Sequence, residues 1–428
     1  MSETATQAEI ALKTSFDLMK DAGAQSLRRG AWEAFANAGL PNKRVESWHY
    51  TDLRAALRAV APLAGAAGAV PAPERRQASC RLVVLDGAFR PDLSDLAALP
   101  AGVGAQSLRE ALASGEADIL AALAGDADDA MIALNAALMQ DGVVLRIAPG
   151  TVVEQPLEIL NAVSSAGAAH SVYARSLVMA GAGASATLIE TLESLETSDA
   201  QENHALLLCL ERGARLEHVC SIARQAEGAV RVLSLLATLG EKAALNSFCL
   251  IEGGGLIRRQ VFATLAGEGA DAAFCGANLL RGRDHADTTL LVRHQSPGGK
   301  SREYFRYIID ESATGVFQGK VSVAQPAQKT DGAMQSKAIL LSDGATMNSK
   351  PELEIFADDV VCGHGATCGR LDADQLFYLQ ARGLPQSEAE ALLIQGFANE
   401  ALKLVAGEQI RETLEERISA WLARRDTK

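Results

Sequence analysis

The side chains best suited to chemistry lie in the sequence Cys362-Gly363-His364-Gly365, which follows an aliphatic, strand-like run. Residues two positions apart in a β-strand project to the same face, so a continuing strand places the Cys362 thiol beside the His364 imidazole. A thiolate and a neutral imidazole are both ligands for soft or borderline metals, iron and zinc among them. The glycines between them leave room for another backbone or a ligand. The segment therefore predicts a metal site at the end of a sheet, with His364 and Cys362 as candidate ligands.

A second interpretation of this pair stays open. A free cysteine is often only a small buried hydrophobe, and the imidazole would then be a hydrogen-bonded core residue. Cys368 has the same strand parity, but a glycine and a helical pattern follow it, so we interpret it as a packing residue. Four further cysteines recur in aliphatic strands and are expected to pack in the core: Cys209, Cys220, Cys249 and Cys275.

Other motifs do not support catalysis by this chain. The segment Ser296–Ser301 (SPGGKS) resembles a phosphate-binding loop, but that pattern requires glycine at position 294, where His294 stands. No strand-to-helix switch surrounds the segment, so we interpret it as a loop and expect the chain to bind no ATP. No serine–histidine–aspartate or paired-carboxylate arrangement is identifiable from the sequence.

Composition narrows the class of protein. The chain has 428 residues and a formal net charge of −13, which argues against nucleic acid as the main partner. No apolar run is long enough to span a membrane, and the N-terminus does not resemble a secretory signal, so we expect a cytoplasmic protein. The seven cysteines show no close CxxC pair and are expected to be reduced.

From Val143 onward, short aliphatic strands alternate with turns, and one unit of strand, turn, alanine and strand recurs six times. The matched alanines are Ala184, Ala214, Ala243, Ala270, Ala313 and Ala345, at separations of about 30, 29, 27, 43 and 32 residues. A near-fixed period in this range indicates a solenoid, and strands without helices between them make it a β-solenoid. The longest gap is predicted to hold an extra strand pair or a loop around Arg293–Lys300. A β-sandwich, whose short strands also recur, is the alternative.

The flanking segments divide the chain into four predicted regions: a helical region and linker (1–80), a mixed α/β segment (81–142), the β-helix core (143–370) and a helical C-terminal region (371–428). The linker is predicted at Ala61–Pro73, and Trp48 and Tyr50 are expected to anchor the first region by packing. Asp372 is predicted to cap the first C-terminal helix, and Ser387 to start the next. Because a solenoid needs covered ends, we expect these helices to act first as caps.

Two blocks of sequence resemble the SufB/SufD family of iron–sulfur cluster assembly proteins: GLPNKRVESWHYTDL at 39–53, and the motif-rich stretch at 348–383. The resemblance covers nearly the whole chain and implies a right-handed parallel β-helix between helical ends. The N-terminal block is most similar to the SufD subunit. Two departures from the SufB-like pattern agree with this: the stretch 330–336 has no cysteine, and Gly365 stands where a glutamate is expected after His364.

The resemblance implies a non-catalytic scaffold subunit in a complex with a SufB-like paralogue and two copies of a SufC-like ATPase. It implies that the C-terminal helices, about 372–404, dock the ATPase. It places His364 at the SufB–SufD interface, where transient iron or a nascent iron–sulfur cluster is the cargo, with Cys362 as a possible second ligand or sulfur neighbour. ATP-driven closure of the ATPase pair is then expected to shift the β-helix pair.

Two other functions stay open. A carbohydrate-active β-helix enzyme would carry acidic clusters and aromatic platforms on one face, for which the chain offers Glu303-Tyr304 and Asp310-Glu311 but few aromatics. A purely structural dimer is the third possibility, since a homodimer through the same β-helix face is expected when the chain is alone.

Overall fold

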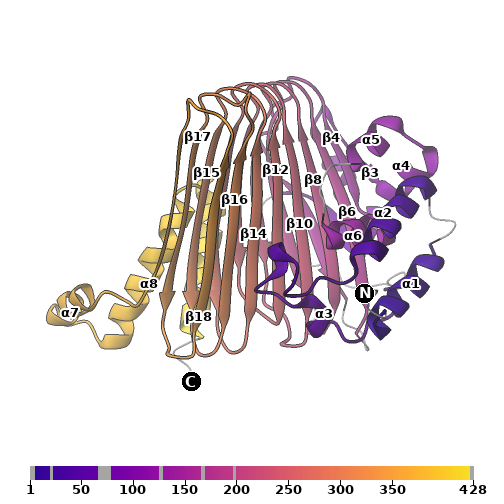
Figure 1. Cartoon of the computed structure of the whole chain (residues 1–428). Coiled ribbons are helices and arrows are strands. Elements are labelled where there is room, and N and C mark those ends of the chain that lie inside the picture. Colours follow the sequence, from indigo (N-terminus) through magenta and orange to yellow (C-terminus); the bar gives the residue numbers. More distant parts are fainter. Residues whose placement is uncertain are drawn as a thin grey trace.

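The computed structural model describes residues 5–19, 23–65, 79–124, 129–164, 169–195 and 199–424. Figure 1 shows strands stacked side by side in a long solenoid, with the N-terminal helices against one side and the C-terminal helices against the other. From β4 onward, successive strands alternate between a nine-stranded and a ten-stranded sheet, so each coil contributes one strand to each sheet. The predicted parallel β-solenoid with flanking helices is confirmed, and the β-sandwich alternative is wrong.

From β4 onward, the strands of each sheet follow one another in sequence order. The ten-stranded sheet consists of β19 (Val361–Gly369), β17 (Asp331–Leu340), β15 (Lys300–Ile309), β13 (Asp271–Leu280), β11 (Ala244–Ile251), β9 (Arg215–Ile222), β7 (Ser185–Ser194), β5 (Leu157–Val163), β1 (Cys80–Leu85) and β2 (Ala88–Phe89). The nine-stranded sheet consists of β18 (Thr346–Ile355), β16 (Thr314–Val323), β14 (His285–His294), β12 (Leu256–Leu265), β10 (Val230–Leu239), β8 (Gln201–Leu210), β6 (Ser171–Ala180), β4 (Val143–Ile147) and β3 (Val103–Ser107). All pairs are parallel except β1 with β2 and β3 with β4.

The repeated alanine marks the turns between strands. The alanines from Ala184 to Ala270 precede odd-numbered strands, whereas Ala313 and Ala345 precede even-numbered strands. The long gap therefore holds three strands, β13, β14 and β15, where the other intervals hold two. The expected extra strand pair or loop is therefore wrong. One additional strand lies in the gap, so from Ala313 onward the alanine stands at the opposite turn of each coil. A buried alanine fits both turns.

Regular register makes each coil stack on the next. The inner faces of the two sheets form one apolar core, which includes Leu188, Leu216, Leu245 and Ala272 in the ten-stranded sheet. These residues belong to alternate positions, and neighbouring strands pair them in register, for example Leu216 with Leu245 and Leu245 with Ala272. Because the residues on one strand face project in one direction, inner and outer positions can be assigned along every strand from this core.

The described chain contains nine α-helices, several of which cover parts of the two sheets. They are α1 (Gln7–Asp17), α2 (Gln25–Ala38), α3 (Leu53–Ala56), α4 (Leu108–Ser114), α5 (Ala117–Leu123), α6 (Ala130–Leu138), α7 (Ala373–Ala381), α8 (Gln386–Leu402) and α9 (Glu408–Ala423). Those near the N-terminus pack on the outer face of the nine-stranded sheet, where Trp48 is 1 % exposed and joins Val232 in one apolar cluster. Those near the C-terminus pack on the outer face of the ten-stranded sheet through Ile394, Ala398 and Ile418.

An N-terminal latch, defined here as Trp48, Thr51, Arg258 and Asp287, fixes the first region to the solenoid. The guanidinium of Arg258 lies 4.1 Å from the Trp48 ring centre and pairs with the Asp287 carboxylate. Thr51 donates its hydroxyl to the same carboxylate, and Arg258 donates to the Ser47 carbonyl at 2.7 Å. The expectation that Trp48 anchors this region is confirmed.

The remaining expectations for the flanking regions have mixed outcomes. Asp372 caps α7 as predicted and accepts from two backbone N–H groups, but α8 begins at Gln386, one residue before the predicted start. Most of the predicted linker, 66–73, lies outside the described residues. The strands β1 and β3 of segment 81–142 extend the two sheets, and the four-region division stays a prediction. None of the helices in the described ranges is long and apolar enough to span a membrane.

Candidate metal centre at the open end of the solenoid

The last coil of the solenoid consists of β18 and β19, and each is the terminal strand of its sheet. In the described chain β19 forms a ladder with β17, and its other edge meets no further strand. Its residues are exposed except for the half-buried Cys362, whereas most residues of β15 are buried. The end of the solenoid core is therefore open at this coil, and the family-like motif lies on its outermost strand (Figure 1).

Cys362 and His364 both lie on the inner face of β19. The register pairs Cys362 with Gly332 and His364 with Met334, and Met334 is a buried core residue. Cys362 also packs against the core, and its Sγ atom lies 3.4 Å from the position that a Cβ atom on Gly332 would occupy. The prediction that the two side chains share one face of a strand is confirmed. Their role as metal ligands stays a prediction.

The two side chains differ in their surroundings. His364 is exposed, so neither ring nitrogen is sequestered in the core. Burial raises the pKa of the Cys362 thiol above its ordinary value of 9.0, so this side chain is protonated at neutral pH in the isolated chain. A metal ion bound at Cys362 has to displace that proton. His364 is exposed whereas Cys362 is half-buried, so His364 is the more accessible ligand of the two.

The other cysteines separate into core and surface residues. Cys220, Cys249 and Cys275 are buried, as predicted, while Cys209 is half-buried. Cys368 is exposed, so the expectation that it packs in the core is wrong: no further coil of the described residues covers this end of β19. All seven cysteines are free. No group of three or more histidine, cysteine or acidic side chains is arranged to hold a metal within the described residues.

Glu303, which the carbohydrate-enzyme alternative requires on an exposed face, is buried in the core. It lies on the inner face of β15, in the same column of paired residues as Met334 and His364. Its side chain is 0 % exposed, and burial raises the pKa of its carboxyl to about 8. Its neighbour Tyr304 projects to the outer face and packs beneath the C-terminal helices. The pair therefore offers no exposed acidic and aromatic platform for sugars, and Asp310 is also buried.

The two family-like blocks meet in space although they are far apart in sequence. Lys350 on β18 forms an ion pair with Glu46 of the N-terminal block at 2.9 Å, and a second one with Glu352 at 3.3 Å. The N-terminal block therefore lies against the outer face of the last coil of the nine-stranded sheet. Because these pairs are solvent-exposed, they orient the block more than they stabilise it.

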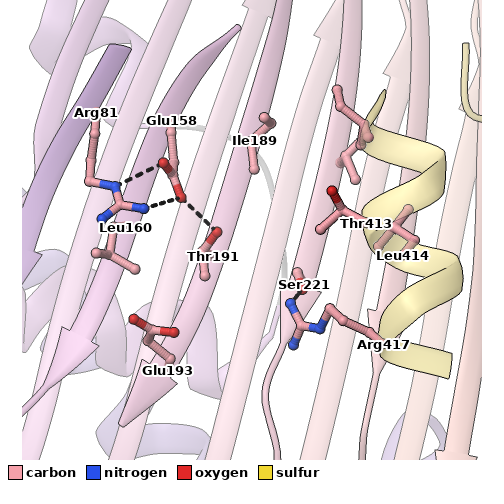
Figure 2. Close-up of a pocket in the computed structure, with 12 residues that line it drawn as sticks. Arg81, Glu158, Leu160, Ile189, Thr191, Glu193, Ser221, Thr413, Leu414 and Arg417 are labelled. Carbon is pink, nitrogen blue, oxygen red and sulfur yellow. Dashed lines mark hydrogen bonds and ion pairs between the residues drawn. The ribbon is translucent and has the colours of Figure 1, made fainter. Parts of the chain in front are cut away.

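A separate polar cavity of about 30 Å³ lies between α9 and the ten-stranded sheet (Figure 2). Arg81 pairs with Glu158 at 2.9 Å, and Thr191 donates to the same carboxylate at 3.0 Å. On the other wall Arg417 reaches from α9 to the Ser221 hydroxyl and pairs with Glu252 at 2.8 Å. These groups satisfy one another and hold α9 on the sheet, so we assign this cavity a structural role.

Helix α7 extends away from the solenoid (Figure 1). It buries no residue, and it exposes two large aromatic side chains, Phe377 at 72 % and Tyr378 at 57 %. Helix α8 behaves differently, because Ile394, Ala398 and Leu402 pack on the sheet. The C-terminal region thus combines a firmly packed helix with a projecting one that has an apolar surface.

Comparison with known proteins agrees with this architecture. Residues 162–397 match the family described as "SUF system FeS cluster assembly, SufBD core domain", and residues 13–159 match the "SufBD protein N-terminal region". The iron–sulfur cluster assembly SufBD family protein slr0076 of Synechocystis is 31 % identical over 394 residues, which cover 88 % of this chain and 86 % of that protein. The iron–sulfur cluster assembly protein SufD of Escherichia coli is 28 % identical over 388 residues, which cover 89 % of each.

The parallel β-solenoid with its histidine- and cysteine-bearing terminal strand belongs to the class of iron–sulfur cluster assembly scaffolds of the SUF system. Within that class, the chain is a member of the SufBD family, and it is SufD-like.

Proposed function

We propose that this chain is a non-catalytic scaffold subunit that joins its terminal coil to the corresponding coil of a SufB-like partner. The observation that carries the proposal is the open edge of β19. An unpaired strand edge presents free N–H and C=O groups and is a template for another strand. A partner strand on this edge would continue the sheet and would cover the exposed inner face of the last coil.

The cargo at this junction is iron or a nascent iron–sulfur cluster. Cys362 and His364 face the same way, and thiolate and imidazole are established ligand types for such clusters. Two ligands are fewer than the roughly four that a cluster takes, so the partner supplies the others. His364 is the primary ligand in this scheme, and Cys362 is a second ligand or a neighbour of the sulfur atoms.

The C-terminal helices are the proposed docking site of a SufC-like ATPase. The exposed aromatic side chains of α7 supply an apolar contact surface, and such side chains are enriched where proteins associate. Helix α8 packs on the ten-stranded sheet, whose last strand is β19. A force applied to these helices by ATP-driven closure would therefore be transmitted to the sheet that carries His364 and Cys362.

The reducing cytoplasm is the proposed location, because all seven cysteines are free and the chain resembles cluster-assembly proteins. In the absence of the SufB-like partner, the same open edge is available to a second copy of this chain. We therefore expect a homodimer when the protein is purified alone.

Co-isolation of the complex tests the pairing. Ala366 is exposed on the inner face of β19, and an inward-pointing charge on an edge strand opposes pairing with another strand. Ala366→Lys is expected to release the SufB-like partner from an affinity-tagged chain while leaving the SufC-like ATPase bound. Lys337→Ala, a change on the neighbouring strand β17, is the control that should retain both. Undiminished co-isolation of the SufB-like partner with Ala366→Lys would show that the two subunits meet elsewhere.

A further inference from the structure

A cavity of about 630 Å³ lies between α2, α5 and α6, on the side of the solenoid away from the terminal coil. Its size is within the range of about 300–1,000 Å³ that is usual for small-molecule sites. Most of its lining is aliphatic, with residues such as Leu27, Leu120, Leu123 and Ile132. Neither the proposed pairing with partners nor the iron site uses this cavity.

Among the described residues, Arg175 is the one charged side chain in the lining of this cavity. It lies on β6, is 1 % exposed, and has no ion-pair partner among the residues that the structure describes. Its hydrogen bonds are long, at 3.3 Å to Asn135 and 3.4 Å to the Leu123 carbonyl, and its Nε atom has no acceptor. Burial lowers the pKa of this guanidinium to about 10, so it still carries its charge at neutral pH.

Two other buried arginines of the solenoid each form an ion pair with a carboxylate. Arg231, which is also 1 % exposed, pairs with Glu202 at 2.9 Å, and Arg258 pairs with Asp287. A buried charge is costly unless it is paired, and unlike Arg231 and Arg258, Arg175 has no carboxylate in ion-pair distance among the described residues. At Arg175 the position that an acidic partner would fill is available to an anion from outside the chain.

The N-terminus of α2 lines the same cavity and also favours an anion. Ala24, Gln25, Ser26 and Leu27 all belong to the lining. The N-cap residue is Ala24, which provides no side-chain cap, and the first turn has no acidic residue. The backbone N–H groups at the start of a helix, together with the helix dipole, attract negative charge. Two independent sources of positive potential, one buried and one helical, therefore meet in one apolar cavity.

We propose that this cavity is a binding site for a small aliphatic carboxylate, such as a medium-chain fatty acid. The carboxylate lies near Arg175 and the first turn of α2, and the hydrocarbon chain packs on the leucine and isoleucine side chains. The site is independent of the proposed iron site, because its residues lie on other elements than the terminal coil.

Isothermal titration of the full chain with octanoate, and separately with 1-octanol, tests the proposal. Octanoate is expected to bind at least about tenfold more tightly than octanol, because only the carboxylate forms charge-assisted hydrogen bonds. Arg175→Met is expected to remove this preference. Equal affinity for the acid and the alcohol, or no binding of octanoate by the wild type, would overturn the proposal.

A second variant keeps the test valid if Arg175→Met fails to fold. A Cβ atom on Gly30 would meet nothing within 4 Å, and Gly30 lines the cavity within α2. Gly30→Leu fills the cavity and strengthens the helix, since leucine favours helices over glycine. It is expected to fold and to lose octanoate binding. Gly396→Leu on α8, where the same open space is present, is the matched control that should bind octanoate normally. Unchanged binding by Gly30→Leu would contradict the assigned site.

Discussion

Glu303 provides the sharpest quantitative prediction about the solenoid interior. Its carboxyl is 0 % exposed, and neither oxygen has a hydrogen-bond partner. Because burial raises the pKa of this carboxyl to about 8, it is protonated at pH 7 in the folded protein. In the unfolded chain it is ionised, since its ordinary pKa is 4.5. Folding at neutral pH therefore requires uptake of a proton, which destabilises the folded state.

The sign and size of the effect follow from proton linkage. A carboxyl with a raised pKa imposes no penalty below the unfolded pKa of 4.5, and its penalty grows as pH rises towards the folded pKa of about 8. The difference between the two pKa values corresponds to about 3 kcal/mol at pH 7 and about 5 kcal/mol well above pH 8. Glu303→Gln keeps the shape and cannot ionise. It is expected to raise the free energy of unfolding by about 3 kcal/mol at pH 7 and to have little effect near pH 4.

Glu202 is the matched control, because it is a buried carboxyl with the opposite shift. Although burial raises its pKa, the Arg231 guanidinium and the His204 hydrogen bond together outweigh that effect and lower the pKa of Glu202 to about 2. A lowered pKa gives stability above about pH 4.5 that is lost as pH falls towards 2. Glu202→Gln is therefore expected to lower the free energy of unfolding at pH 7 by about 3 kcal/mol or more, because it leaves Arg231 without its partner.

Urea unfolding, followed by far-ultraviolet circular dichroism at pH 5, 7 and 9, measures both changes. The midpoint for Glu303→Gln should exceed that of the wild type increasingly as pH rises, and the midpoint for Glu202→Gln should be lower at each of these values. If Glu303→Gln destabilised the protein at pH 7 as Glu202→Gln does, the Glu303 carboxyl would be ionised and paired, and the reasoning would be refuted.

Three further predictions concern the latch, the docking helix and the terminal strand. Asp287→Ala is expected to lower the free energy of unfolding by about 3–5 kcal/mol, because it leaves the buried Arg258 guanidinium without its carboxylate partner. The double variant Asp287→Leu with Arg258→Met should recover most of that loss, measured by urea titration. Phe377→Ser is expected to leave the unfolding midpoint unchanged but to weaken binding of the SufC-like ATPase at least about tenfold in calorimetric titration. Ala366→Lys is expected to convert the purified homodimer to a monomer, measured by light scattering after gel filtration.

Each of these predictions has a contradicting result. A double variant at Asp287 and Arg258 that is no more stable than Asp287→Ala would mean that the latch does not depend on charge pairing. Val152→Ser, an exposed residue outside the C-terminal helices, is the control for Phe377→Ser, and equal weakening by both would contradict docking through these helices. A dimer that persists with Ala366→Lys would have its interface away from β19.

The strand periodicity was sufficient to predict the solenoid and the shared orientation of Cys362 and His364. A period of two residues assigns side chains to faces but does not say which face is inside. The segment Ser301–Tyr307 illustrates the limit, because both of its faces carry polar and aromatic residues. Glu303 lies on the inner face only because Phe305 and Tyr307 fill the core beside it, and that depends on the stacking of whole coils.

Other features depended on contacts between distant segments and were not accessible from local patterns. The change of the alanine motif from one turn of the coil to the other could not be predicted, because both kinds of turn accept a small buried residue. The cavity at Arg175 is formed by α2, by two helices of the segment 81–142 and by a strand, so no single stretch of sequence predicts it. Cys368 is exposed because β19 is the last strand of its sheet in the part of the chain that the structure describes, and a strand pattern alone does not predict this.

The most direct test of the central claim is the iron and acid-labile sulfide content of the complex. This chain would be co-expressed with its SufB-like and SufC-like partners and isolated without oxygen, as wild type, His364→Ala, Cys362→Ser and Cys368→Ser. The account predicts that every variant assembles the complex, that His364→Ala loses most of the bound iron, and that Cys368→Ser retains it. If iron and sulfide were unchanged in His364→Ala, the histidine would be structural, and the role of this chain would be to hold its partners in place.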